Sequence, residues 1–495
     1  MFLRRSIHNE VRLMIAEKRK YGRTKIVCTL GPASSSVETL EKMIEAGMDV
    51  ARLNFSHGTH DDHLQMMNRV RQAAKNQDEP IAILLDLQGP KIRTGKLKEP
   101  MELKDGERLT ITIDEMLGEN HKVSTTYQHL PKDVKPGDTI LMDDGLLQFK
   151  VISAAKREVI TEVVHGGILK SNKGINLPGV SVSAPSMTEK DKEDLLFGIA
   201  NDIDYVALSF VRSAQDVVHL REFIIANIDK RKKLPIISKI EKDEALTNID
   251  AIIHESDGSM VARGDLGVEC KTEEVPLAQK MIARKANAAG KPVIIATQML
   301  DSMIENPRPT RAEANDVANA VLDGADAVML SGETSVGKYP VIVVKTMDTI
   351  VRRVEEEAKD KLYLEDEVGS ENDAVFKALG RSACILAKQI NAAAIICFSH
   401  SGSTVKAISR YRPNAQVIGI ADRERIQRRL NLIWGVRSLL IKSFEVGETD
   451  TTIARVNLSL VELGYLKKGD FVVITAGIPL MSRNTTNMIK VEKIL

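Results

Sequence analysis

The segment 236–241 places a lysine and a glutamate two residues apart at the end of an apolar run. Side chains two apart on a strand project from the same face, so Lys239 and Glu241 are predicted to point into one site. In α/β folds with parallel strands, catalytic groups gather at the carboxyl ends of the strands. Taken alone, the pair fits an incidental ion pair at a solvated strand end equally well.

Carboxylates, cations and hydroxyls recur after nearly every apolar run of the chain. These residues are Arg52, Asn54, Ser56, Asp86, Arg93, Lys239, Glu241, Arg263, Gly264, Asp265, Thr297, Ser331 and Glu333. A capped or solvated loop explains any one of them, but stability alone does not explain their recurrence. We therefore predict that they share one site at the strand ends.

The acidic members of this set indicate a divalent metal. Glu241 and Asp265 supply hard oxygen ligands, which suit Mg²⁺ or Mn²⁺ with some water retained. No cluster of histidine and cysteine competes as a zinc site. Gly264 precedes a predicted helix start, where free backbone N–H groups accept a carboxylate.

The basic members indicate phosphoryl chemistry. Arg52, Arg93 and Lys239 are of the types that hold and neutralise a phosphoryl group during transfer. Cations, a divalent metal and an anion-binding helix start together favour a phosphorylated carboxylate as substrate. The residues alone thus predict phosphoryl transfer.

Eight strands alternating with helices are predicted to position these groups. The strands are 24–30, 48–53, 81–87, 205–210, 235–240, 260–262, 292–297 and 327–330. Short links between strands and helices predict parallel pairing. Eight parallel βα units in one domain form a (β/α)8 TIM barrel, with its active site at the strand carboxyl ends.

Two further domains interrupt and follow the predicted barrel. Short alternating strands and turn dipeptides over 95–178 predict an inserted small β-barrel domain, a candidate lid. Residues 354–495 have their own α/β rhythm and are predicted to form a C-terminal α/β domain. The barrel is thus expected over 23–94 and 179–353, after an N-terminal extension over 1–22. This extension is basic and is expected to form a surface helix, with a transit peptide as the alternative.

Composition excludes several classes of function. The 495 residues are 43% hydrophobic and 28% charged, as in a water-soluble globular protein, and the formal net charge is +1. That balance and an aromatic content of 4% argue against a nucleic-acid partner. No apolar run is long enough to span a membrane. Four widely spaced cysteines, none in a CxxC pair, predict a reduced, cytoplasmic protein.

A series of motifs from Arg23 to Leu495 closely resembles the pyruvate kinase family. The motifs occupy 24–32, 52–58, 89–95, 173–179, 239–241, 262–267, 296–300, 309–313 and 331–334. The resemblance implies transfer of a phosphoryl group from phosphoenolpyruvate to ADP, giving pyruvate and ATP. It also implies a homotetramer.

The resemblance assigns a role to each candidate residue. Lys239 stabilises the phosphoryl group in flight, Glu241 and Asp265 bind Mg²⁺ or Mn²⁺, and Arg52 contacts the substrate phosphate. The substrate carboxylate lies at Gly264, Asp265 and Thr297. Thr297 and Ser331 belong to the network that protonates the enolate. The residues implied in nucleotide binding are Asn54, His57, Arg93 and Lys173.

One departure from the family pattern concerns a monovalent cation. The family usually binds K⁺ at positions matching Asn54, Ser56, Asp86 and the carbonyl of Leu87. Lys91 stands where many members carry a glutamate. Our hypothesis is that the Lys91 ammonium supplies the charge of K⁺, as in the K⁺-independent branch. The alternative is a surface lysine in a protein that still requires K⁺.

The C-terminal domain resembles the family's effector-binding domain. Ser399, Ser401, Gly402, Ser403 and Thr404 are predicted to bind a phosphorylated effector at a helix start, with helix capping as the alternative. The segment 476–487 resembles the loop that closes over a sugar phosphate. Four arginines in 423–429 are expected at a subunit interface or in solvent.

Two rival interpretations stay open. The first is another metal-dependent barrel enzyme that uses phosphoenolpyruvate or a keto acid, such as an aldolase or lyase; such enzymes lack the inserted domain with Lys173. The second is an inactive paralogue that only binds a phosphorylated metabolite, against which the intact set Lys239, Glu241, Asp265 and Thr297 argues.

Overall fold

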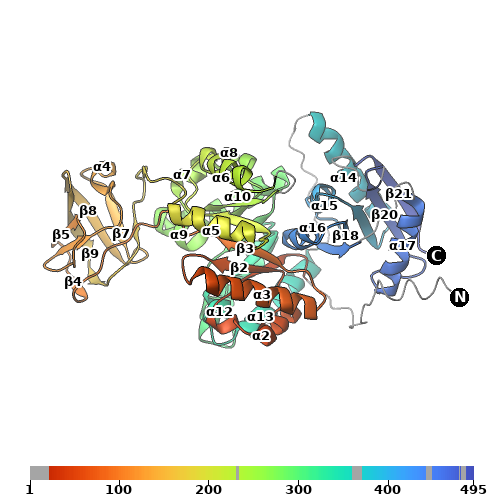
Figure 1. The fold of residues 1–495 in the computed structure, drawn as a ribbon, viewed down its shortest axis with the longest axis horizontal. Helices are drawn as coiled ribbons and strands as arrows, with labels where there is room; N and C mark the ends of the chain where they lie inside the picture. The colour runs from red at the N-terminus through yellow and green to blue at the C-terminus, as the bar shows by residue number, and fades with distance from the viewer. Residues whose placement is uncertain (1–21, 230–232, 359–370, 442–448, 479, 481–485) are drawn as a thin grey trace.

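The computed structural model describes residues 22–229, 233–358, 371–441, 449–478, 480 and 486–495. A central barrel lies between a small β domain at one end and an α/β domain at the other (Figure 1). The predicted N-terminal extension falls, except for residue 22, outside the described residues. Within the described part, no helix is long and apolar enough to cross a membrane.

Eight parallel strands close the central barrel, as predicted. They are β1 (Lys25–Thr29), β2 (Val50–Asn54), β3 (Ala82–Asp86), β12 (Tyr205–Leu208), β13 (Ile236–Ile240), β14 (Gly258–Ala262), β15 (Val293–Ala296) and β16 (Ala327–Leu330). Their order around the barrel is β1-β16-β15-β14-β13-β12-β3-β2. Most of their residues are buried on both faces, which explains why they read as continuous apolar runs.

Helices surround the barrel. The principal ones are α2 (Val37–Ala46), α3 (His60–Asn76), α5 (Glu189–Ala200), α6 (Ala214–Asn227), α7 (Asp243–Thr247), α8 (Ile249–Glu255), α9 (Arg263–Glu269), α10 (Val275–Ala289), α11 (Arg311–Leu322), α12 (Gly332–Ser335) and α13 (Pro340–Glu357). Side-chain caps set several starts: the Ser36 hydroxyl accepts from Thr39 N, and Thr59, Thr188 and Thr310 form capping boxes.

The inserted domain, called the lid below, is a mostly antiparallel β unit with a core of its own, in which only β5 and β6 pair in parallel. Its elements are β4 (Met101–Leu103), β5 (Arg108–Thr112), β6 (Lys122–Ser124), α4 (Leu130–Asp133), β7 (Thr139–Met142), β8 (Leu147–Ala154), β9 (Glu158–His165), β10 (Gly167–Leu169) and β11 (Ile175–Asn176). Six strands form one sheet in the order β11-β7-β8-β9-β5-β6, and β10 pairs with β4. Alternate residues of β8 and β9 are buried, which gives the period-two pattern of the sequence.

The C-terminal part is a five-stranded sheet with helices. It contains α14 (Glu371–Gln389), β17 (Ala394–Phe398), α15 (Ser403–Ser409), β18 (Gln416–Ala421), α16 (Glu424–Arg429), the 3₁₀ helix η4 (Leu430–Leu432), β19 (Val436–Leu440), α17 (Thr449–Glu462), β20 (Phe471–Ala476) and β21 (Met488–Lys493). The sheet order is β19-β18-β17-β20-β21, and β21 runs antiparallel at the edge. Sequence patterning missed β21, because this edge strand is largely half-exposed and lacks a clear apolar alternation.

The C-terminal part closes the amino-terminal end of the barrel, called the floor below. Leu432 of η4 is fully buried and packs in the same cluster as the inward-facing barrel residues, among them Val27, Tyr205 and Ile294. The Tyr205 hydroxyl donates to the Arg429 carbonyl at 2.6 Å. One residue of the inner barrel core is therefore supplied from outside the barrel sequence.

Three of the four arginines in 423–429 have a role that differs from the prediction. Arg425 and Arg428 pair with Asp202, Arg428 also pairs with Asp204 at 2.9 Å, and Arg429 donates to the Asp204 carbonyl. Arg71 completes this network at 2.9 Å from Asp204. The three side chains hold two parts of one chain together, because docking against the floor pairs them with carboxylates far away in the sequence.

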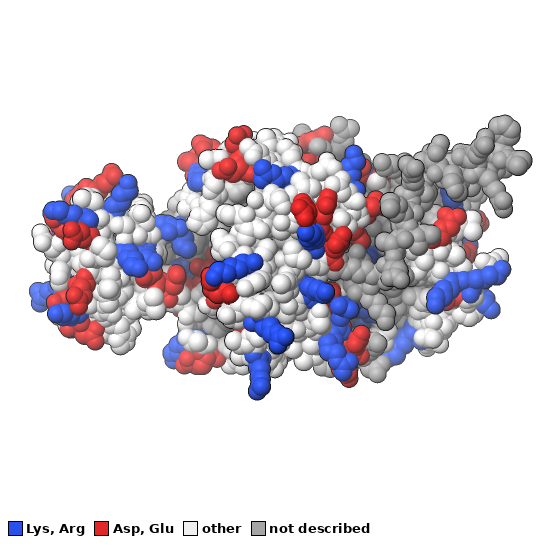
Figure 2. Space-filling view, turned by 90° about the horizontal axis from the view of Figure 1, so that it is seen from below, with Lys and Arg blue, Asp and Glu red and all other residues white. Residues whose placement is uncertain are grey.

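Charge on the molecular surface is mixed. On the face shown in Figure 2, basic and acidic side chains of the described residues are interspersed. This agrees with the formal net charge of +1.

Candidate active site

Lys239 and Glu241 lie together at the carboxyl end of β13, as their spacing predicts. The Lys239 Nζ is 2.8 Å from Glu241 Oε1, 3.2 Å from Asp86 Oδ1 and 2.7 Å from the Ser209 hydroxyl. Burial alone lowers the pKa of Lys239, but the carboxylates of Asp86 and Glu241 outweigh it and raise that pKa above its ordinary value. The ammonium is therefore held charged and in a fixed direction.

Arg52 and Asp86 form the second ion pair of the site. Arg52 Nε is 2.7 Å from Asp86 Oδ2, and its Nη1 donates to the Thr29 hydroxyl at 2.8 Å. Burial raises the pKa of Asp86, but Lys239 and Arg52 prevail and lower it below its ordinary value. The 1% exposed side chain of Asp86 thus stays ionised between two cations and fixes both.

Glu241 and Asp265 are the two residues that the sequence predicts as metal ligands. Burial raises the pKa of Glu241, and the nearby negative charge of Asp265 adds to this effect against the opposing Lys239. The backbone N–H of Phe210, a residue at φ 54°, donates to Glu241 Oε2 at 2.7 Å. Two carboxylates that repel each other suit a hard divalent cation that keeps water and substrate as its other ligands. Among the described residues no group of three or more metal-ligating side chains occurs.

Gly264 and Thr297 meet at the ends of β14 and β15. The Gly264 N–H donates to the Thr297 hydroxyl at 2.7 Å, so this N–H is not free, in contrast to the sequence prediction. Thr297 and Gln298 both have positive φ, 68° and 54°, which is uncommon for such residues and marks a constrained turn. The turn holds the Thr297 hydroxyl at the barrel mouth.

Ser331 carries a buried hydroxyl without a partner among the described residues. Its backbone N–H donates to Glu333 Oε2 at 2.6 Å, and Glu333 Oε1 accepts from Leu300 N at 3.1 Å. A buried hydroxyl without a protein partner calls for a water or a ligand. Ser331 is therefore poised to hydrogen-bond a group outside the protein.

The predicted nucleotide contacts come from the barrel mouth and from the lid. Asn54 Oδ1 accepts from Ser56 N at 3.2 Å, and the His57 carbonyl lies 2.9 Å from His63 Nε2. Arg93 donates to the Asn172 carbonyl at 3.2 Å. Lys173 forms a 2.7 Å ion pair with Asp143 inside the lid, so in this arrangement its charge is held by the lid itself.

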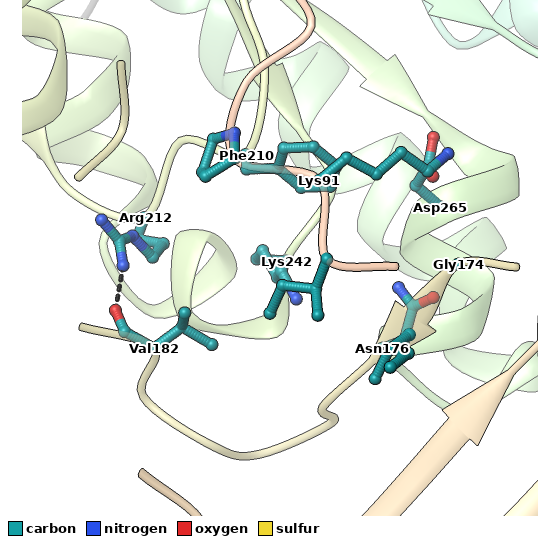
Figure 3. A pocket seen from close by; sticks show the side chains of 11 residues that line it. Lys91, Gly174, Asn176, Val182, Phe210, Arg212, Lys242 and Asp265 are labelled. Atoms are coloured by element: carbon teal, nitrogen blue, oxygen red, sulfur yellow. Dashed lines mark hydrogen bonds between the residues drawn. The ribbon is translucent and has the colours of Figure 1, made fainter. Parts of the chain in front are cut away.

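A pocket opens between the lid and the barrel (Figure 3). Lys91, Gly174, Asn176, Lys242 and Asp265 are among the residues that line it. In Figure 3 the Lys91 side chain points toward Asp265. Three lysine and arginine residues, Lys91, Arg212 and Lys242, thus line this pocket.

Sequence analysis missed several residues of this region, namely Thr29, Ser209, Phe210, Arg212, Lys242 and Glu269. The Ser209 hydroxyl accepts a hydrogen bond from Lys239 Nζ and donates to the Leu87 carbonyl at 2.7 Å. The signal for Ser209 and Phe210 was present, because they end the strand run 205–210 in the same way as the recognised residues end theirs. Lys242 and Glu269 have no such signal, since only the fold brings them together.

The predicted effector residues lie in the C-terminal part, apart from the barrel mouth. Ser399 Oγ accepts from Gly402 N at 2.9 Å, Ser401 and Ser403 pair at 2.8 Å, and Thr404 pairs with Thr486 at 2.7 Å. No side-chain cap is formed at the start of α15, so the capping alternative is not realised. Positions 479 and 481–485 of the segment 476–487 lie outside the described residues.

Comparisons with known proteins agree with this geometry. Family models described as "Pyruvate kinase, barrel domain" and "Pyruvate kinase, alpha/beta domain" match residues 21–344 and 377–492. A pyruvate kinase of Geobacillus stearothermophilus is 48% identical over 480 residues, which are 96% of this chain and 81% of that protein. One of Staphylococcus aureus (strain MRSA252) is 46% identical over 473 residues, 95% of this chain and 80% of that protein.

A solved structure extends the similarity to the whole fold. The crystal structure of a pyruvate kinase from Cryptosporidium parvum superposes with a TM-score of 0.90 at 38% identity, covering 96% of each chain. Two family models, close relatives and a matching fold lead to one conclusion. The chain belongs to the pyruvate kinase family of phosphotransferases.

Proposed function

We propose that this enzyme transfers the phosphoryl group of phosphoenolpyruvate to ADP, giving pyruvate and ATP, the last step of glycolysis, in the cytoplasm. The observation that carries the proposal is the position of the Lys239 ammonium. It is held by Asp86, Glu241 and Ser209 at the barrel mouth, beside the pocket with Asp265. A fixed compact cation is what a phosphoryl group in flight requires.

Transfer breaks the bond between phosphorus and the enol oxygen and forms a bond to a terminal oxygen of ADP. Lys239 and Arg52 stabilise the charge on the phosphoryl oxygens, while the substrate carboxylate binds at the turn where Thr297 lies beside Asp265. The enolate left behind takes a proton at its methylene carbon to give pyruvate. The unpartnered Ser331 hydroxyl, together with Thr297, supports a role in orienting the water that brings this proton.

Glu241 and Asp265 are proposed to hold Mg²⁺, or Mn²⁺ in its place. The mutual repulsion that contributes to the raised pKa of Glu241 supports this assignment, because a divalent cation relieves it. When bound, the metal supplies positive charge near the transferring group. Asn54, His57, Arg93 and Lys173 are proposed to contact the nucleotide once the lid lies over it.

Independence from K⁺ is proposed on the basis of Lys91 and of contacts already made. Both oxygens of Asp86 accept from Arg52 or Lys239, and the Leu87 carbonyl accepts from Ser209, so these expected K⁺ ligands already have partners. Turnover is expected to be close to maximal in K⁺-free Tris or Na⁺ buffer, and Lys91→Glu is expected to create a K⁺ requirement. A large activation of the unmodified enzyme by K⁺ contradicts this proposal.

Regulation and assembly complete the proposal. A phosphorylated metabolite is proposed to bind at Ser399, Ser401, Gly402, Ser403 and Thr404, and the chain is proposed to form a homotetramer. Kinetics of phosphoenolpyruvate saturation in the presence of sugar phosphates or AMP, together with light scattering, test these two points.

The direct test combines purified protein with Mg²⁺, phosphoenolpyruvate and ADP and measures pyruvate and ATP. Equal amounts of both products are expected. Pyruvate formed without ADP favours the rival lyase or aldolase. Failure to form ATP, with or without sugar phosphates, favours the inactive binding protein.

A further inference from the structure

Glu269 joins the lid to the barrel through two contacts. It lies at the end of α9, and its side chain is 2% exposed. Its Oε1 accepts from Asn176 Nδ2 of the lid at 2.8 Å and from Lys242 Nζ of the barrel at 2.5 Å. A carboxylate shared by an amide and an ammonium forms charge-assisted hydrogen bonds, which are stronger than neutral ones.

The neighbours of Glu269 connect this contact to the active site. Asp265 lies four residues earlier in α9, so both side chains project from the same face of the helix. Lys242 directly follows Glu241 in sequence. On the lid side, Asn176 is three residues from Lys173, the proposed nucleotide contact. Asn176, Lys242 and Asp265 all line the pocket.

A second attachment of the lid differs in kind. Arg212 donates to the carbonyls of Val182 and Ala184, in the segment by which the chain returns to the barrel (Figure 3). These bonds hold backbone at the base of the lid. Glu269 instead holds one side chain of β11, at the pocket. Breaking the Glu269 contact therefore frees the pocket side of the lid while its base stays attached.

We propose that Glu269 is a positioning residue that latches the lid and thereby sets the position of Lys173, three residues from Asn176, relative to the pocket. The inference rests on the proposed function, in that the latch acts on nucleotide binding. Since phosphoenolpyruvate is proposed to bind at the barrel mouth, the latch affects the KM for ADP and spares the KM for phosphoenolpyruvate.

The test first replaces the attractive contact between Asn176 and Glu269 by a repulsive one and then restores a hydrogen bond between the two positions. Asn176→Asp places a carboxylate against Glu269 and is expected to raise the KM for ADP about tenfold, the value of one charge-assisted hydrogen bond, with less than a twofold change for phosphoenolpyruvate. Adding Glu269→Gln restores a hydrogen bond, with the glutamine amide as donor. The double variant is expected to recover most of the affinity for ADP. Glu119→Gln in the exposed lid pair Lys98–Glu119 serves as the control and is expected to change neither constant.

Hydrogen exchange of the ligand-free protein provides a readout that needs no activity. Exchange at Ile175, whose N–H donates to the Ile92 carbonyl, is expected to accelerate in Asn176→Asp and to return in the double variant. Unchanged exchange, or faster exchange with an unchanged KM for ADP, overturns the latch. If the unmodified protein phosphorylates no ADP, the proposed function fails, and recovery of exchange in the double variant still decides whether the latch exists.

Discussion

Each end of the barrel holds a buried aspartate between two cations. At the mouth, Asp86 lies between Arg52 and Lys239. At the floor, Asp204 lies between Arg71 and Arg428. Both carboxylates are at most 1% exposed, so burial and charge alone do not distinguish the two clusters.

The two clusters differ in how many of their polar and charged groups have partners within the protein. At the floor, Asp204 also accepts from Ile83 N at 2.9 Å, and the C-terminal part covers the cluster. At the mouth, Glu241 and Asp265 repel each other, the Ser331 hydroxyl has no partner among the described residues, and a pocket lies alongside. The floor cluster is thus fully paired and joins two parts of the chain. The mouth cluster has unpaired polar groups and unrelieved charge repulsion, as expected of a site that binds a ligand.

The largest expected effect separates two buried lysines. Lys239→Met is expected to lower kcat at least about a thousandfold, because the phosphoryl group loses its fixed cation, while Mn²⁺ binding followed by electron paramagnetic resonance persists. The floor lysine Lys25, which donates to the Val436 carbonyl at 2.9 Å, provides the matched variant. Lys25→Met is expected to lower the melting temperature and to leave kcat within about threefold. Near-normal turnover in Lys239→Met refutes the mechanism.

The two aspartates allow the next comparison. Asp86→Asn is expected to lower kcat about a hundredfold, because Arg52 and Lys239 lose the charge that directs them. Asp204→Asn is expected to cost about 3–5 kcal/mol of stability, measured by urea unfolding, because the half-buried Arg71 and Arg428 lose the charge of their fully buried partner. A loss of turnover in folded Asp204→Asn equal to that of Asp86→Asn erases the distinction between mouth and floor.

Two hydroxyls near β16 test whether a buried polar group without a protein partner serves catalysis and one with a partner serves stability. Ser331→Ala removes a hydroxyl that has no partner in the described part of the chain and is expected to reduce kcat about tenfold with no loss of stability. Thr334→Val removes a buried hydroxyl that donates to the Thr29 carbonyl at 2.8 Å. That variant is expected to lose about 1 kcal/mol of stability and little activity. Calorimetry and turnover measured on both variants check the contrast.

The smallest expected effect is on the loss of stability as the pH falls, and it involves His63. His63 stacks on Phe55 with ring centroids 3.8 Å apart, and burial lowers its pKa despite its bond to the His57 carbonyl. In the unfolded chain the pKa is about 6.5. As the pH falls through that value the unfolded state binds a proton first, so stability declines until the pH passes the lower pKa of the folded state. His63→Gln is expected to flatten this decline in melting curves between pH 7.5 and 5, and an unchanged decline assigns it to other groups.

Much of the fold could be predicted from the sequence because parallel strands buried on both faces leave unmistakable apolar runs. The positions of Lys239, Glu241 and Thr297 followed from the rule that chemistry sits at the ends of such strands. The edge strand β21 lacks that signal.

Partners were harder to predict than positions. The bond between Asn176 and Glu269 joins residues 93 positions apart, and that between Arg428 and Asp204 spans 224. Nothing local marks either pair, since only the docking of the lid and of the C-terminal part creates them. The same holds for the Gly264 N–H, which was expected to be free and is used by Thr297.

The position of Leu432 in the sequence delays completion of the barrel core during synthesis of the chain. Its side chain fills the floor of a core whose last strand, β16, ends at Leu330, about a hundred residues earlier. A ribosome adds roughly 5–20 residues per second, so every new barrel waits seconds with its floor open and Lys25, Asp202 and Asp204 without their C-terminal partners. The barrel and the C-terminal part therefore reach their final stability together. A chain that ends between them is expected to leave the floor of the barrel core uncovered and the barrel destabilised.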